Sequence, residues 1–129
     1  MSDKLTAKDL EDVFNAFNAH DVDTVMKPFS DDCVFYPVAG DTVMGTKIEG
    51  AEAIRNAFVG VWTAMPDAQW ANHSHFVCDD YGVSQWTFIG TNAEGMRVEA
   101  QGVDIFKIKD GKIVEKNAFR KQRPPFKVA

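Results

Sequence analysis

Apolar residues recur at helical spacing in the first half of the chain and at alternating positions in the second half. Two short helical stripes precede residue 30, and they predict a helix that begins near Thr6 and a shorter one capped by Asp21. A third stripe over residues 50–65 predicts a helix that Pro66 ends. Alternating patterns predict strands near residues 33–38, 69–78, 83–91, 95–109 and 112–121.

Helical segments that come first and strands that come second are typical of an α+β domain. We therefore expect three N-terminal helices packed on a curved, mainly antiparallel sheet. Such an arrangement forms a cone-shaped α+β barrel that encloses a pocket. The 129 residues suit one domain over residues 1–129, with enough chain to bury a core.

One carboxylate interrupts the most regular strand pattern, "MRVEAQGVDIFKI" at residues 96–108. Asp104 lies in a row whose other members are small or apolar. A buried bare carboxylate costs several kcal/mol, so it must be paired, hydrogen-bonded or protonated. If this row faces the pocket, Asp104 can act as an acid or base. If the strand twists, Asp104 lies at a wet edge or binds backbone amides.

The turn "KDGK" at residues 109–112 decides which residues of the last strand lie opposite Asp104. A two-residue Asp110-Gly111 loop sets Asn117 across from Asp104. That register turns three neighbours toward the pocket: Ile113, Glu115 and Phe119. A longer loop with a bulge shifts the pairing by one residue and exchanges the faces. It turns three others inward: Lys116, Ala118 and Arg120. We favour the first register because it places more apolar surface inside.

Further candidates come from aromatic residues and histidines. Trp86 and Phe88 share one face of "SQWTFIG", and with Phe106 and Phe119 they would form a wall for a flat hydrophobic ligand. Tyr36 could donate a hydrogen bond into the cavity or simply pack its ring. His73 and His75 lie two apart and so on one side of a strand. His75 could work with Asp104 in acid–base chemistry, or both imidazoles could lie at the sheet edge.

Several function classes are not indicated. The net charge is −5, and the only basic cluster is "RKQR" at residues 120–123, so we expect no nucleic acid as partner. No stretch is long and apolar enough to span a membrane. The chain has no third ligand at a metal-site spacing, no HExxH and no phosphate-binding glycine loop, so we expect neither metal nor cofactor. Cys33 and Cys78 in apolar contexts, with no secretory signal, indicate free thiols in a reducing cytoplasm.

Three stretches, "FNAHDVDTVMKPFSDDCVFYPVAG", "GTKIEGAEAIRNAF" and "GVDIFKIKDGKIVEK", resemble the nuclear-transport-factor-2-like superfamily. The resemblance is to its SnoaL-like polyketide cyclase and ketosteroid isomerase branches. In those isomerases an Asp on a long strand keeps its proton and donates a hydrogen bond to the substrate oxygen, and Asp104 falls on that position. The isomerases' base falls here on Tyr36. Their first-helix Tyr falls near Val13 and Phe14, which cannot donate a hydrogen bond.

Together these features predict a small cofactor-independent enzyme of isomerase or cyclase type, acting on a hydrophobic carbonyl compound. The expected catalytic residues are Asp104, Tyr36 and His75. The expected substrate-binding residues are Val13, Phe58, Trp86, Phe88, Phe106, Asn117 and Phe119. The alternatives are a non-catalytic small-molecule-binding protein and a purely structural dimerisation module, because this fold hosts many functions. The resemblance also implies a homodimer that pairs through the outer face of the sheet.

Overall fold

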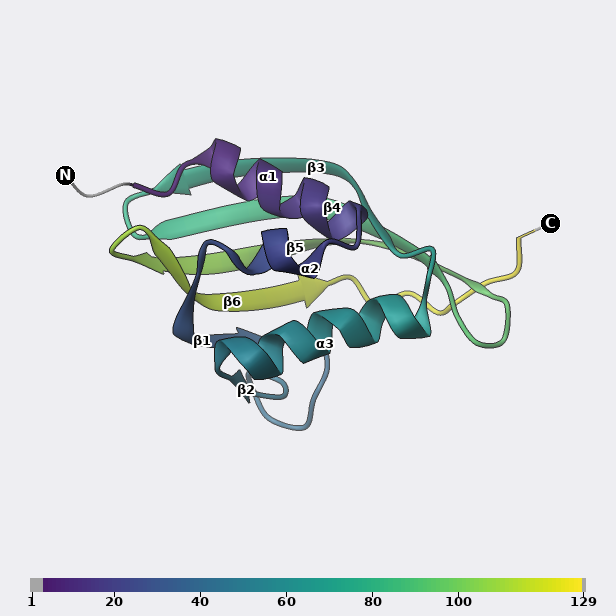
Figure 1. Cartoon of the computed structure of the whole chain (residues 1–129). Coiled ribbons are helices and arrows are strands. Elements are labelled where there is room, and N and C mark those ends of the chain that lie inside the picture. Colours follow the sequence, from purple (N-terminus) through teal and green to yellow (C-terminus); the bar gives the residue numbers. More distant parts are fainter. Residues whose placement is uncertain (1–3, 129) are drawn as a thin grey trace.

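A computed structural model describes residues 4–128 and shows helices laid on one face of a curved sheet (Figure 1). The three helices are α1 (Ala7–Asn18), α2 (Val22–Met26) and α3 (Ala51–Ala64). The six strands are β1 (Phe29–Tyr36), β2 (Ile48–Glu49), β3 (Gln69–Cys78), β4 (Tyr81–Thr91), β5 (Arg97–Lys109) and β6 (Lys112–Arg120). Within the described part of the chain, no helix is long and apolar enough to cross a membrane.

The helices form where the apolar stripes predict them. Thr6 caps α1 in a reciprocal capping box with Asp9, and Asp21 caps α2 through the backbone amide of Thr24. The stripe of α1 is buried against β3, and that of α3 packs against β1. The two longer helices therefore cover opposite halves of the same sheet face, and an apolar space is left between them.

The strand order across the sheet is β2-β1-β6-β5-β4-β3. Every neighbouring pair is antiparallel except β1 and β6, which run parallel. This arrangement confirms the predicted α+β class with a mainly antiparallel curved sheet, although the sheet is not closed into a barrel. Strand β1 begins at Phe29, four residues before the predicted start at residue 33, and the two-residue β2 has no counterpart in the prediction.

The β5–β6 hairpin corrects the register that we favoured. Asp110 and Gly111 both have positive φ, as a two-residue type I′ turn requires, and Lys109 pairs with Lys112 as expected. Beyond the turn, however, Ile108 pairs with Ile113 and Lys107 with Glu115. Val114 is thus an extra residue, a β-bulge that shifts all later pairs by one.

Because of this bulge, Asp104 pairs with Ala118 and not with Asn117. Side chains of β6 beyond Val114 exchange faces relative to an uninterrupted hairpin. Lys116 and Ala118 are consequently buried on the helix-covered face, whereas Phe119 is 49% exposed on the outer face. The prediction of the turn is correct, and the register derived from it is wrong.

Gly102 allows one large side chain to lie flat against the sheet. It pairs with Trp86 across β4 and β5, and a Cβ at residue 102 would come within 2.5 Å of the Trp86 ring. It would also come within 2.4 Å of the Phe119 carbonyl oxygen, a backbone atom that cannot move cheaply. The glycine therefore sets where the indole lies.

We predict that Gly102→Ala destabilises the fold by about 1–3 kcal/mol, since the added methyl group overpacks a buried contact. Urea denaturation followed by circular dichroism measures the change. The matched control is Gly60→Ala, because Gly60 lies inside α3 with no atom near the added methyl group. That control should be neutral or stabilising. Equal effects of the two variants would contradict the packing role of Gly102.

Candidate active site

The helix-covered face of the sheet contains an apolar cavity of about 220 Å³. Its walls come from the end of α1, from α3 and from β1, β3, β4 and β6, and most of its lining is apolar. The aromatic residues in the lining are Phe17, Phe35, Phe58, Trp70, Trp86 and Phe88. Two cationic side chains, Lys116 and Arg120, are its only charged lining residues in the described part of the chain.

Asp104 lies on the pocket side of the sheet but behind the pocket surface. Its carboxylate is fully buried, and both of its oxygens have partners. The Nζ of Lys116 donates to Oδ1 at 2.8 Å, and the indole Nε1 of Trp86 donates to Oδ2 at 2.9 Å. The cost of burying the carboxylate is offset by one opposite charge and two hydrogen bonds.

Lys116 is the group that reaches from this buried pair to the cavity. It is only 6% exposed, and its ammonium lies 4.6 Å from the ring centre of Phe35, with Phe17 and Phe58 at 5.6 and 5.7 Å. Aromatic faces attract cations, so the three rings stabilise the charged form alongside the carboxylate. The ammonium has three N–H donors and gives one to Asp104, so others remain to bind a ligand.

Arg120 lies two positions beyond Ala118 and also lines the cavity. Its guanidinium carbon lies over the Phe88 ring, 5.1 Å from the ring centre, in a cation–π contact. Burial lowers the pKa of Arg120 from its usual value. No carboxylate within residues 4–128 forms an ion pair with it, unlike Lys116.

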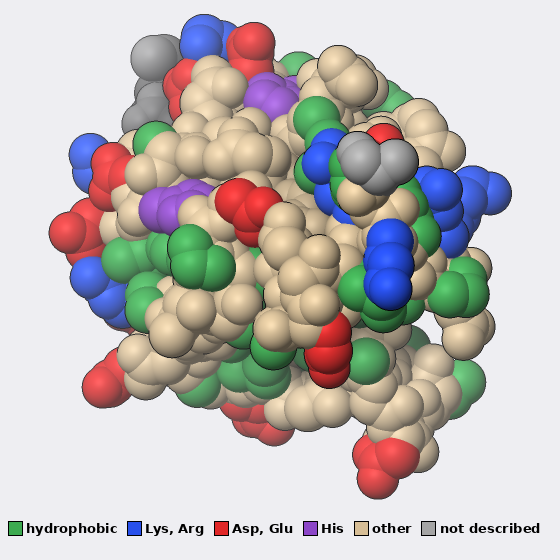
Figure 2. Space-filling view, turned by 90° about the vertical axis from the view of Figure 1, so that its right-hand side faces the viewer, with side chains coloured by type: hydrophobic (Ala, Val, Ile, Leu, Met, Phe, Trp, Pro, Cys, Tyr) green, Lys and Arg blue, Asp and Glu red, His purple; other side chains and the backbone are tan. Residues whose placement is uncertain are grey.

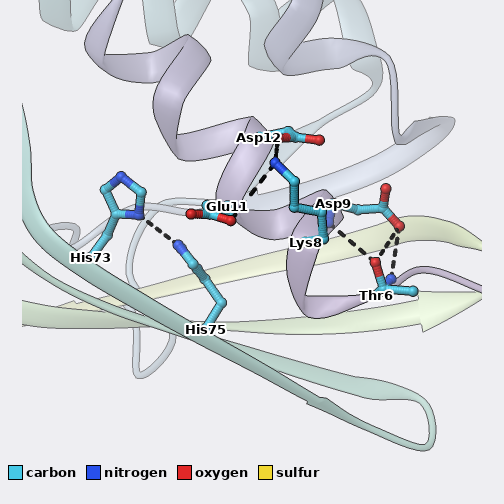
Figure 3. A network of polar contacts seen from close by, with 7 residues as sticks. All are labelled: Thr6, Lys8, Asp9, Glu11, Asp12, His73 and His75. Atoms are coloured by element: carbon cyan, nitrogen blue, oxygen red, sulfur yellow. Dashed lines mark hydrogen bonds and ion pairs between the residues drawn. The ribbon is translucent and has the colours of Figure 1, made fainter.

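The two histidines of β3 form a separate polar chain next to α1. Figure 3 shows His73 and His75 directed toward each other, with Glu11 of α1 close by. The Nδ1 of His73 lies 2.7 Å from the Nε2 of His75, and the Nδ1 of His75 lies 2.7 Å from the buried Ser84 hydroxyl. Desolvation and the neighbouring His73 lower the pKa of His75 to about 4. No three potential metal ligands come together among the described residues.

The remaining candidates fall into three groups. Trp86, Phe88 and Phe58 line the cavity. Phe106 and Val13 belong to the buried core, and His75 packs under Phe14 of α1, so none of these three lines the cavity. Tyr36, Asn117 and Phe119 are only partly buried or exposed, and each alternates with an inward-facing neighbour on its strand.

Sequence reasoning placed Lys116 and Arg120 inside only under the register that we did not favour. Two signals point to them. A lysine in an alternating strand opposite the row of Asp104 is the natural partner for a buried carboxylate, and "NAFR" places an arginine four residues further on. Favouring the register with more apolar surface inside ignored the charge that Asp104 needs beside it.

Residues 10–116 match the family model of the SnoaL-like domain. The chain belongs to the SnoaL-like family. A comparison with curated protein sequences finds no match.

Solved structures resemble this SnoaL-like domain in fold. Bal32a, from a soil-derived mobile gene cassette, superposes with a TM-score of 0.79 at 17% identity, over 90% of this chain and 88% of that one. A protein assigned as a polyketide cyclase from Xanthomonas campestris pv. campestris gives 0.75 at 16%, over 88% of each chain. TerC, co-crystallised with polyporic acid, gives 0.75 at 16%, over 88% of this chain and 89% of that one.

The buried pair predicts a strong energetic coupling between Asp104 and Lys116. We expect Lys116→Met alone or Asp104→Asn alone to destabilise the domain by about 3–5 kcal/mol, because each leaves an unpaired charge inside the protein. The double variant should recover at least half of that loss. Denaturant unfolding of the four proteins forms a double-mutant cycle. Additive losses would show that the two groups do not stabilise each other.

The lowered pKa of His75 predicts a pH dependence of stability. The unfolded chain takes up a proton near pH 6.5, whereas the folded imidazole does so only near pH 4. Stability is therefore complete above pH 6.5 and falls as the pH drops from 6.5 toward 4. We expect a loss of about 1–2 kcal/mol, reduced by solvent screening because the ring is partly exposed. His75→Gln should flatten the curve of unfolding free energy in this window, and parallel curves would contradict the assignment.

Proposed function

We propose that this SnoaL-like protein is a small cofactor-independent enzyme of isomerase or cyclase type, acting on a hydrophobic carbonyl compound. The observation that carries the proposal is the Lys116–Asp104 pair at the wall of an aromatic-lined cavity. Buried charged groups beside an apolar cavity are typical of sites where proton-transfer chemistry takes place. The flat rings of Trp86 and Phe88 suit a planar substrate.

In the proposed mechanism the substrate oxygen accepts a hydrogen bond from Lys116. Hydroxide from solvent takes a proton from the carbon next to the carbonyl group and becomes water, and the negative charge that remains lies on that oxygen, as an enolate. A fixed ammonium in a dry cavity stabilises such a charge far more than water does. Lys116 keeps its own proton and stabilises the enolate as a hydrogen-bond donor, and Asp104 holds the lysine in place. Water then returns a proton to the carbon and regenerates hydroxide. Proton shifts and aldol-type ring closures both pass through such an enolate.

This assignment gives Asp104 a role one step removed from the substrate. The buried carboxylate lies behind Lys116 and Trp86, so it acts as a positioning residue for the lysine. The expected roles of Tyr36 and His75 in the same chemistry are not part of the proposal, because neither lines the cavity. The similarity to a protein assigned as a polyketide cyclase supports a cyclase-type small-molecule site.

A second candidate function is a binding protein that holds a similar ligand without converting it. The complete burial and double hydrogen bonding of Asp104 favour it, since a fully satisfied carboxylate has no capacity left for chemistry.

The expected homodimer stays a prediction. Three apolar side chains on strands β3, β5 and β6 are exposed and support this prediction: Phe76, Ile105 and Phe119.

The deciding experiment is exchange of α-protons for deuterium in a panel of neutral ring ketones, followed by NMR. We expect the parent protein to accelerate exchange, and Lys116→Met to lower the rate by about 100-fold, the usual effect of losing one oxyanion donor. Asp104→Asn should lower it while ligand affinity is retained. Lys109→Met is the matched control, because Lys109 is an exposed lysine at the end of β5.

Ligand binding without exchange in the parent protein would overturn catalysis and leave the binding function. Unchanged exchange in Lys116→Met would refute the role of the lysine. Binding is followed separately through tryptophan fluorescence, since Trp70 and Trp86 line the cavity. Because Lys116→Met is expected to lower stability, exchange is measured under conditions where circular dichroism shows each variant to be folded.

A further inference from the structure

The charges around the cavity do not cancel. Lys116 is neutralised by Asp104 at 2.8 Å, so this pair contributes no net charge. Arg120 lines the same cavity, and within residues 4–128 it forms no salt bridge with any carboxylate. The cavity thus carries one uncompensated positive charge, although the whole chain has a net charge of −5.

Arg120 is also placed where a ligand would have to enter. It also lines a second hollow next to the cavity, together with Val38, Lys121 and Arg123. Val38 and Arg120 belong to both hollows, so they mark the mouth of the apolar cavity. Figure 2 shows a group of Lys and Arg side chains on the right of the face at the C-terminal end of the molecule, with others at its top and left edges. The basic cluster "RKQR" of the sequence therefore lies at the entrance of the cavity.

The guanidinium of Arg120 lies over the Phe88 ring. No carboxylate within residues 4–128 pairs with its N–H groups, so they can bind a planar anion, and two of them match the two oxygens of a carboxylate. Burial alone lowers the pKa of Arg120, so no neighbouring acidic group offsets the cost of its desolvation. A bound carboxylate would supply that compensation.

We propose that the ligand is an aromatic carboxylate of one or two rings, whose acidic group binds Arg120 at the mouth and whose carbonyl oxygen binds Lys116 at depth. This inference rests on the proposed function, because it takes the same cavity as the ligand site. The two residues are four apart on one strand, about 13 Å along it, so the ligand carries its polar groups toward opposite ends. A cavity of about 220 Å³ lies below the roughly 300–1,000 Å³ of drug-sized sites, which indicates one or two rings.

The test compares two probes of the same shape, naphthalene-2-carboxylate and the uncharged naphthalene-2-carboxamide. Isothermal titration at low salt measures both affinities. We expect the parent protein to bind the carboxylate about tenfold more tightly, the effect of one charge-assisted bidentate contact in a half-buried site. Arg120→Gln should remove this preference and leave the affinity for the carboxamide nearly unchanged. Arg120→Lys should keep part of it, because the charge remains and the two-pronged geometry is lost.

Lys121→Gln is the matched control, since it removes the same charge from the adjacent residue, which lines the outer hollow and not the cavity. It should leave the preference intact. Arg120→Met, which keeps an apolar stem over Phe88, replaces the glutamine variant if that protein does not fold, and it should show the same loss. Equal binding of the two probes by the parent protein, or a preference that survives in Arg120→Gln, would overturn the inference.

The experiments can refute the proposed function and the proposed ligand independently of each other. Deuterium exchange is measured on neutral ketones and depends on Lys116, whereas the carboxylate preference is an equilibrium property that depends on Arg120. A preference without exchange makes the protein a binder of aromatic acids. Exchange without a preference leaves the enzyme in place and refutes the anionic ligand.

Discussion

A carboxylate cannot stay charged in an apolar interior without a partner, and this constraint organises the pocket side of the sheet. Asp104 is fully buried, and the groups that satisfy it come from the two strands on either side, Trp86 from β4 and Lys116 from β6. Each partner is itself held by something else. Gly102 leaves room for the indole, and three aromatic rings surround the ammonium. The buried Asp104 pair and the aromatic lining of the cavity therefore depend on each other.

Much of the fold follows from periodicity. The stripes of α1 and α3 and the alternation of β4 and β5 identify these elements because each buries one continuous face. Short elements were missed because few of their own residues are buried. Strand β2 has two residues, and the first part of β1 reads "FSDD", whose two aspartates are exposed at the surface. Pattern alone cannot recognise a strand that the neighbouring strands of the sheet stabilise.

The type of site could be predicted from the sequence, but not all of the residues that form it. The sequence singled out Asp104, and the aromatic wall was expected from Trp86 and Phe88, which do line the cavity. The residues supplied by β6 depend on one inserted position, Val114, and a bulge leaves hardly any mark in the residue pattern. Charge pairing could have identified the correct register, because a buried aspartate needs a cationic partner and only one of the two registers places a lysine beside it.

The extra residue at Val114 has a consequence for how this hairpin can change over time. Substituting a side chain near it alters one contact. Losing or gaining a single residue between the tip and Lys116 would exchange the two faces of β6 and turn the lysine toward solvent. The spacing from the tip to the lysine is therefore under stronger constraint than most of the individual residues within it. Divergence within this segment should proceed by exchange of amino acids and hardly ever by change of length.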